Sequence, residues 1–432
     1  MAALVGMAAQ GAGAQELTEN ERLGRSIFFD TELSLHRNQA CAACHGPEVG
    51  FTGPIAAINA AGSVYEGSIS GRFGNRKPPS SAYATPSPVL FPEFDEEESE
   101  KAAATFIGGN FWDGRATGEK LGNPAADQAQ SPFLNPVEQA LPDNACVVHR
   151  VCNPANPAEY PVSFEGVWGD ESCDISWPSD VDSACSQEDG HVDLSADDRA
   201  RVEAAYDAIA LSIAAYEGSP ASNRFSSKFD AWQAGLVDLS KLERQGFDIF
   251  KGQAKCSNCH VLDDGPKGEP ALFTDFTYDN LGVPRNPDDP WYTMADFNPA
   301  GFDFLDEGLG SFLAMRKDYA RYAAANLGKQ KVPTLRNLDK RPTPDFSKAF
   351  MHNGYFKTLE GVVHFYNTRD TKPVCPDRFT TEADALAAGC WPEPEVSVNV
   401  NTAELGDLKL TPAQEAALVA FLKTLSDGFV PE

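Results

Sequence analysis

Two copies of the pentapeptide C-x-x-C-H constrain this 432-residue chain more than any other feature, and they occupy residues 41–45 and 256–260. This spacing is that of c-type haem attachment, in which both thiols bond to the haem edge and the adjacent histidine ligates the iron. A zinc site would need further cysteine or histidine at ligand spacing, and neither copy has it. We therefore predict two covalently bound haem c groups. Their attachment residues and iron ligands are Cys41, Cys44, His45, Cys256, Cys259 and His260.

The segments that precede the two pentapeptides also repeat. E-R-L-G at 21–24, followed by Phe28, precedes the first copy, and E-R-Q-G at 243–246, followed by Phe250, precedes the second. Each pattern predicts a short amphipathic helix that packs on its haem, and the matched placement favours two related haem domains. The predicted organisation is a signal-peptide remnant at 1–16, a first haem domain at 17–225 and a second haem domain at 226–432.

Helical patterns alternate with long Pro/Gly-rich loops, so we predict a mostly α fold without a large sheet. Residues 196–217 are predicted to form one helix. The last helix is predicted at 411–425, where a threonine cap is followed by proline at the first helical position. Segments 142–192 and 371–403 carry the remaining cysteines, and we expect both to be disulfide-pinned insertions.

Net charge and composition exclude several classes of partner. The formal net charge is −28, from 35 Lys and Arg against 63 Asp and Glu. Nucleic acid and anionic membranes are poor partners for such a chain, whereas a basic protein would be attracted. No uncharged apolar run reaches the ~18 residues that a membrane helix needs. The first 15 residues are small and apolar and end in A-G-A, which resembles the end of a signal peptide without its basic start.

Export would place the chain in an oxidising compartment, which covalent haem attachment also favours. Of the ten cysteines, six lie outside the haem motifs, and we expect them to form three disulfides. The simplest pairing joins sequence neighbours, and the other connectivities stay open. It joins Cys146 with Cys152, Cys173 with Cys185, and Cys375 with Cys390.

Ordered blocks across most of the chain resemble the bacterial dihaem cytochrome c peroxidase family and, within it, the MauG-like branch. The blocks include F-W-D-G-R at 111–115, V-P-T-L-R-N at 332–337 and M-H-N-G at 351–354, beside both haem motifs. The resemblance implies two cytochrome c-like haem domains and a periplasmic oxidoreductase that reacts with H2O2. It assigns the peroxide chemistry to the first haem.

The resemblance also implies three residues on the peroxide side of the first haem, because Gln128, Pro132 and Glu138 lie at the family's mutual offsets. Glu138 would be the acid/base that carries a proton from the inner to the outer oxygen of peroxide. Pro132 would crowd the iron, and Gln128 would orient Glu138. The alternative for Glu138 is a loop residue in a salt bridge. No histidine lies between His45 and His149, so we expect an open first iron at rest, unlike the ordinary peroxidases of the family.

Tyr366 is the predicted sixth ligand of the second haem, because it lies fourteen residues after His352, where the ordinary peroxidases carry methionine. Tyrosine at this place is typical of the MauG-like branch, and a phenolate stabilises ferric iron over ferrous. Tyr366 could instead be a buried helix aromatic. His364 is a rival ligand, but it lies about 200° from Tyr366 around a helix, so both cannot face one iron.

Trp112 matches the family's tryptophan between the haems, where an indole can relay an electron; the alternative is a core aromatic. The resemblance further implies a Ca²⁺ between the haems. Its ligands would be the carbonyls of Ser347 and Ala349 and the side chain of Asn75, although the alignment could place Lys77 there.

The predicted function is a MauG-like, more narrowly MbnH-like, enzyme that uses H2O2 to form a high-valent two-haem oxidant. This oxidant would attack a Trp or Tyr of a partner protein, with conversion of Trp to kynurenine in a copper-binding protein of the same operon as the narrowest prediction. Ala254 stands where MauG itself places a surface tryptophan before its second haem motif. The alternatives are a dihaem peroxidase that takes electrons from a small redox protein, and an electron-transfer cytochrome without catalysis.

Overall fold

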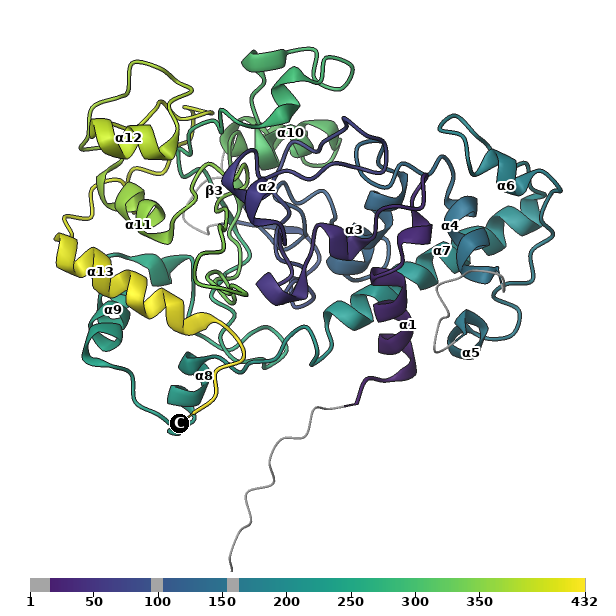
Figure 1. Ribbon diagram of the computed structural model, residues 1–432, viewed down its shortest axis with the longest axis horizontal. Coiled ribbons are helices and arrows are strands. Elements are labelled where there is room, and N and C mark those ends of the chain that lie inside the picture. The colour runs from purple at the N-terminus through teal and green to yellow at the C-terminus, as the bar shows by residue number, and fades with distance from the viewer. Residues whose placement is uncertain (1–15, 95–103, 154–162, 432) are drawn as a thin grey trace, which may run out of the picture.

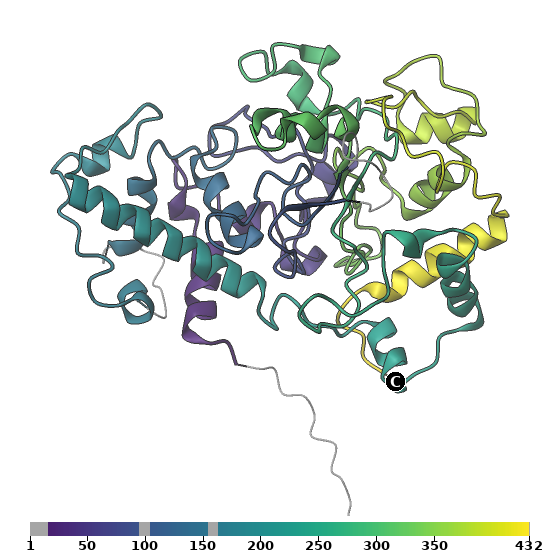
Figure 2. The same ribbon diagram turned by 180° about the vertical axis from the view of Figure 1, so that it is seen from behind.

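The computed structural model describes residues 16–94, 104–153 and 163–431. The signal-peptide remnant predicted at 1–16 therefore lies almost wholly outside the described residues. Figure 1 shows the early helices α1, α3, α4 and α7 at one end of the molecule and α9, α11, α12 and α13 at the other, and Figure 2 shows this arrangement from behind. The long loops between these two groups fill the middle.

The fold is mostly α, as predicted, with little strand. The helices are α1 (Glu19–Phe28), α2 (Ala56–Ala60), α3 (Pro124–Leu134), α4 (Asn144–Cys152), α5 (Phe164–Trp168), α6 (Val181–Ala184), α7 (Ala196–Glu217), α8 (Lys228–Gln233), α9 (Lys241–Lys251), α10 (Gly308–Met315), α11 (Leu359–Thr368), α12 (Glu382–Ala388) and α13 (Pro412–Leu422). The strands form two antiparallel pairs, β1 (Phe91–Glu93) with β2 (Thr105–Ile107), and β3 (Tyr278–Asp279) with β4 (Gln330–Lys331). No helix among the described residues combines the length and apolar character that crossing a membrane requires.

The two helices predicted from the longest patterns are confirmed. Helix α7 has the predicted bounds, and Ser195 caps its N-terminus by accepting a hydrogen bond from the Asp198 N–H. Helix α13 begins after Thr411, which forms a capping box with Gln414, and a 3₁₀ turn extends it to Leu425. Capping boxes satisfy N–H groups that the first turn leaves without a partner.

The E-R-x-G repeat has a structural explanation in both of its copies. Its glutamate is the third residue of the helix and forms a capping box with the residue before the helix. Glu21 pairs in this way with Thr18 in α1, and Glu243 pairs with Ser240 in α9. Its glycine is the point where the helix crosses a second helix. A Cβ on Gly24 would lie 1.8 Å from the Ser212 carbonyl oxygen in α7. A Cβ on Gly246 would lie 1.9 Å from the Ala417 carbonyl oxygen in α13.

Each of these crossings forms a hydrophobic core, and the phenylalanine of the repeat lies in it. Phe28 is fully buried and packs edge-on against Tyr216 of α7, with ring centroids 5.4 Å apart. Phe250 is fully buried and packs edge-on against Phe421 of α13 at 5.2 Å. The two cores are thus built on the same plan, as the repeat predicted.

The disulfides correct part of the predicted pairing. Cys375 pairs with Cys390 as predicted, but Cys146 pairs with Cys185, and Cys152 pairs with Cys173. The predicted bond between Cys146 and Cys152 was wrong because both lie in α4. Six residues of helix separate their Cα atoms by about 9 Å, beyond the reach of about 7 Å that a disulfide allows. The segment 142–192 also contains α4, α5 and α6, which its weak periodicity did not predict.

We expect the substitutions Gly24→Ala and Gly246→Ala each to destabilise the protein by about 1–3 kcal/mol, because a methyl group would push two helices apart. The gain in helix propensity, about 1 kcal/mol, offsets only part of this cost. Guanidinium unfolding of the haem-loaded protein measures the effect. Gly166→Ala in α5 is the control, since its Cβ would meet only the Ser163 hydroxyl, at 3.0 Å. Equal unfolding midpoints for all three variants would contradict this account of the crossings.

Candidate active site

Each pentapeptide folds as a 3₁₀ turn that follows the helix carrying the repeat. The turns are Cys41–Ala43 and Cys256–Asn258. Their cysteines form no disulfide, although the six other cysteines of the chain are all paired. Burial raises the pKa of Cys41 and of Cys256 to about 12. Both thiols are therefore protonated at neutral pH and stay available for attachment to haem.

The histidine of each pentapeptide is held in a single tautomer. His45 Nδ1 lies 3.1 Å from the Phe51 carbonyl oxygen, and His260 Nδ1 lies 2.8 Å from that of Phe273. A carbonyl oxygen only accepts, so Nδ1 carries the proton and Nε2 presents a lone pair to a metal. Burial lowers the pKa of His45 to about 4 and lowers that of His260. The donor set thus fits haem iron at both places.

Two cavities lie against these turns. The first cavity, of about 200 Å³, is lined by Cys41, Cys44 and His45. The second cavity, of about 210 Å³, is lined by Cys256, Cys259 and His260. Several residues line both cavities and form what we name the dividing wall. They are Lys77, Pro79, Ser80, Trp112, Lys331, Val332, Pro333 and Thr334.

Trp112 stands in the dividing wall and is 7% exposed. Its indole N–H donates to the Lys77 carbonyl oxygen at 2.9 Å, and its ring lies edge-on to His352, with centroids 6.4 Å apart. Backbone bonds hold this part of the wall, from the Lys331 N–H to the Trp112 carbonyl and from the Lys77 N–H to the His352 carbonyl. An aromatic ring therefore faces both predicted haem sites.

The structure brings Gln128, Pro132 and Glu138 together on the first cavity. Gln128 and Pro132 are one turn apart on α3 and so share a face. Pro132 lies inside the helix and has no N–H to donate to the Gln128 carbonyl four residues before it. Glu138 follows α3 in a turn, in which the Glu138 backbone N–H donates to the Asn135 carbonyl oxygen at 2.9 Å.

Burial raises the pKa of Glu138, while Arg115 and the Asn135 side chain oppose the rise. Glu138 forms no salt bridge among the described residues, in contrast to the alternative interpretation of it as a paired loop residue. Arg115 instead bonds Asp113 at 2.8 Å and lies over the Phe111 ring. A carboxyl group with a raised pKa inside a cavity is suited to take up and release a proton.

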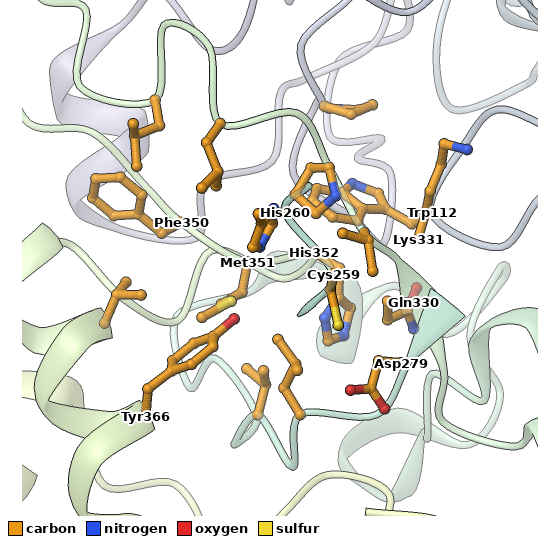
Figure 3. A pocket seen from close by; sticks show the side chains of 18 of the residues that line it. Trp112, Cys259, His260, Asp279, Gln330, Lys331, Phe350, Met351, His352 and Tyr366 are labelled. Atoms are coloured by element: carbon orange, nitrogen blue, oxygen red, sulfur yellow. The ribbon is translucent and has the colours of Figure 1, made fainter. Parts of the chain in front are cut away.

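Tyr366 and its rival His364 point to different sides of α11, as helical periodicity predicted. Tyr366 lines the second cavity, and Figure 3 shows its hydroxyl directed into it. His364 is not among the residues that line the cavity, and its Nδ1 lies 3.0 Å from Glu415 Oε1. Burial raises the pKa of Tyr366, and the nearby Cys256 adds to the rise.

Met351 also lines the second cavity, and sequence analysis did not assign it a role. Figure 3 shows its sulfur and the Tyr366 hydroxyl directed to the same part of the cavity. Its positive φ of 68° is rare for a residue with a side chain and could have drawn attention only in the structure.

The three residues implied for Ca²⁺ do not form an evident cation site. The Ser347 carbonyl oxygen already accepts a hydrogen bond from Asn59 Nδ2 at 3.1 Å. Ala349 lines the second cavity, whereas Asn75 lines neither cavity. Among the described residues, the one group of three Cys, His or acidic side chains close enough to share an ion is Cys259, Asp279 and Glu404. It includes a cysteine of the haem motif.

Comparisons with known proteins agree with this geometry. Residues 18–238 match the family described as di-haem cytochrome c peroxidase. The methylamine utilization protein MauG of Paracoccus denitrificans is 32% identical over 406 residues, which cover 94% of this chain and 88% of that protein. The cytochrome-c peroxidase IdrP2 of Denitromonas iodatirespirans is 24% identical, over 96% of this chain and 83% of that protein.

Two solved structures share the fold. The diheme peroxidase BthA from Burkholderia thailandensis has a TM-score of 0.67 and 28% identity, over 96% of this chain and 88% of that one. A MauG-like protein associated with microbial copper homeostasis has a TM-score of 0.52 and 20% identity, over 95% of this chain and 91% of that one. The second likeness supports the fold alone.

Glu217 is a buried carboxyl group of the first cavity that sequence analysis missed. It is the last residue of α7, is 3% exposed and forms no salt bridge among the described residues. Burial raises its pKa from 4.5 to about 8. An acidic residue at a helix C-terminus opposes the helix dipole, and this conflict was the sequence signal that could have found it.

Glu217 should make stability fall with rising pH. Its folded pKa is raised above its unfolded value, so the folded state binds the extra proton and loses stability as pH rises from about 4.5 through about 8. We expect Glu217→Gln to become more stable relative to the parent as pH rises from 5 to 8. Unfolding midpoints across this pH range measure the difference. The control is Glu203→Gln, exposed on the same helix, and an unchanged difference across the range would contradict the prediction.

Proposed function

This chain belongs to the di-haem cytochrome c peroxidase family, with MauG-like character, and from that premise we propose that it uses H2O2 to oxidise an aromatic side chain of a partner protein. Family membership makes it an oxidoreductase that acts with peroxide and carries two haem c groups. The observation that supports the narrower proposal is the direction of the Tyr366 hydroxyl into the second cavity. A phenolate ligand there favours the oxidised states that a two-electron oxidant needs.

The first cavity supplies the proton chemistry in this proposal. Bound haem supplies the iron at which the O–O bond of peroxide breaks and, with the second haem, stores two oxidising equivalents. Glu138 takes a proton from the inner oxygen of H2O2 and returns it to the outer oxygen, which leaves as water. Pro132 presents no hydrogen-bond donor and narrows the cavity. Gln128 lies on the same face of α3 and orients Glu138 and H2O2.

Trp112 would couple the two cavities, since it is the indole of the dividing wall. Its N–H donates to the Lys77 carbonyl, whose partial negative charge stabilises an electron-deficient ring. With haem held in both cavities, Trp112 would be placed to relay an electron between them while the protein substrate stays outside.

The substrate in this proposal is a Trp or Tyr of a periplasmic partner, and conversion of Trp to kynurenine in a copper-binding protein of the same operon is the narrowest form. The likeness to a MauG-like protein associated with copper homeostasis prompts that choice. Ala254, where MauG itself has a surface tryptophan, is 3% exposed and offers no aromatic exit at that position.

The test is to incubate the diferric protein with H2O2 and the neighbouring operon protein, and to map oxidised residues by mass spectrometry. Turnover of H2O2 with a small redox protein, with no modified residue, would replace this proposal by the ordinary peroxidase.

A second function has one specific observation in its favour. The thioether of Met351 shares the part of the cavity that Tyr366 faces, and methionine is the sixth ligand expected of the ordinary peroxidases. If Met351 binds the second iron, the protein would be a peroxidase fed by a small redox protein.

We expect Tyr366→Phe to change the absorption spectrum of the second haem and to raise its reduction potential, because the anionic ligand of ferric iron is lost. Tyr366→Met should raise the potential and stabilise the ferrous form. Spectroelectrochemistry measures both effects. Tyr355→Phe, another buried tyrosine, is the control and should match the parent. A parent-like second haem in Tyr366→Phe, together with an altered one in Met351→Leu, would assign the ligand to Met351.

We expect Glu138→Gln to slow the spectral change that follows H2O2 addition by about 10²–10⁴. Glutamine keeps the size of the side chain and removes its proton transfer. In the parent the rate should fall as pH drops through the raised pKa of Glu138, because only the carboxylate accepts the proton.

Stopped-flow mixing of the diferric protein with H2O2 measures these rates, and the exposed Glu165→Gln is the control. The variant should lose the acid limb of the pH profile. A diferric parent that stays inert until one haem is reduced would contradict the open first iron.

A further inference from the structure

We propose that the ammonium groups of Lys348 and Lys77 take the place of the Ca²⁺ that the family implies between the haems. The chain would then carry its inter-haem cation covalently and bind no structural calcium. The residues implied as calcium ligands lie next to these lysines in sequence, since Ser347 and Ala349 flank Lys348.

Lys348 is held as a cation by three neutral oxygens. The residue is 3% exposed, and its Nζ donates to the carbonyl oxygens of Val49 at 2.9 Å, Asn337 at 3.1 Å and Lys340 at 3.1 Å. An ammonium group has three N–H bonds and matches three acceptors, whereas a neutral amine has only two. Burial and the charge of Lys77 lower the pKa of Lys348. Three carbonyl acceptors within hydrogen-bond distance of Nζ favour the charged form.

This ammonium joins parts of the chain that belong to different haem motifs. Val49 lies four residues after His45, while Asn337 and Lys340 lie beyond the second motif. The two segments touch closely, since a Cβ on Gly50 would lie 2.6 Å from the Asn337 Cβ. Bringing backbone carbonyls from both segments onto one positive charge is the task that a bridging Ca²⁺ performs with oxygen ligands.

Lys77 places a second positive charge in the dividing wall. The residue is 8% exposed, and its Nζ donates to Thr52 Oγ1 at 2.9 Å and to the Pro78 carbonyl oxygen at 3.0 Å. Its charge acts on Lys348 and on His45, and in each case it lowers the pKa of the neighbour. Both lysines line the second cavity and Lys77 also lines the first, so together they form one cationic region at the dividing wall.

A calcium ion does not fit this region. Ca²⁺ needs six to eight oxygen ligands, usually with carboxylates among them. The carbonyl oxygens of Val49, Asn337 and Lys340 accept from Lys348, and that of Ser347 accepts from Asn59. Two ammonium groups would also repel a dication. Asp339 is the acidic group whose charge reaches Lys348, but its carboxylate bonds Arg341 at 2.7 Å.

The first test needs no substitution and does not depend on the partner protein. The dihaem protein is dialysed against EGTA, and its calcium is measured by mass spectrometry together with both reduction potentials. We expect calcium far below one equivalent per chain, and spectra and potentials that neither EGTA nor added Ca²⁺ changes. One tightly held equivalent, or a potential that falls with EGTA and returns with Ca²⁺, would overturn the proposal.

The second test removes the charge. Lys348→Met keeps the length of the side chain without its ammonium, and we expect it to lower the potential of the second haem because a nearby positive charge favours the ferrous state. Lys317→Met, which removes an exposed lysine, is the control and should match the parent. Lys348→Ala leaves the three carbonyls open, and added ethylammonium, but not Ca²⁺, should restore part of the lost potential. A parent-like potential in Lys348→Met would overturn the proposal, and if that variant does not fold, the calcium measurement on the parent decides alone.

Discussion

The hydrogen bond from Nδ1 of each motif histidine to a backbone carbonyl is the interaction on which both cavities depend. It fixes the tautomer, and therefore the direction in which Nε2 offers its lone pair. The acceptors, Phe51 and Phe273, lie outside the pentapeptides, in loops that the buried cores hold in place. An iron site in this protein thus rests on long-range packing as much as on the five residues of its motif.

The dividing wall turns two similar haem sites into one functional unit. Trp112 is bonded through its side chain to Lys77, and through its backbone to Lys331, so that both cavities share fixed atoms. The chemistry of the two sides differs, since Glu138 and Glu217 line the first cavity, whereas Tyr366 and Met351 line the second. The asymmetry comes from both helices and loops, since Glu217 and Tyr366 lie on α7 and α11, whereas Glu138 and Met351 lie outside helices.

The region between the two cavities is rich in lysine, although the molecule as a whole is strongly acidic. The chain carries a net charge of −28, yet its dividing wall contains the buried Lys77 and the half-buried Lys331, and the buried Lys348 lies beside it. Each of these ammonium groups is bonded to neutral oxygens, which stabilises it without cancelling its charge. Such a region raises haem potentials and attracts anionic groups, while the acidic exterior repels anions and favours a basic partner.

The sequence alone determined the features that depend on near neighbours along the chain. These include the haem attachment motifs, the bounds of α7, the threonine cap of α13 and the bond between Cys375 and Cys390, which closes a loop of 15 residues. The separation of Tyr366 from His364 also followed from the geometry of one helix. Local spacing is sufficient in each case because covalent geometry and helical periodicity set the distances.

Only the tertiary structure decided what depends on residues far apart in sequence. The bond between Cys146 and Cys185 needed the position of α6 relative to α4. The burial of Glu217 depends on residues distant in sequence, such as Ser81, that lie beside the end of α7. The contact of Lys348 with Val49 joins positions 299 residues apart, and nothing in the local pattern around either residue specifies it. Such contacts form only when folding brings backbone carbonyl oxygens from distant segments around one charged group. The free energy of burying that group depends on all of these oxygens together.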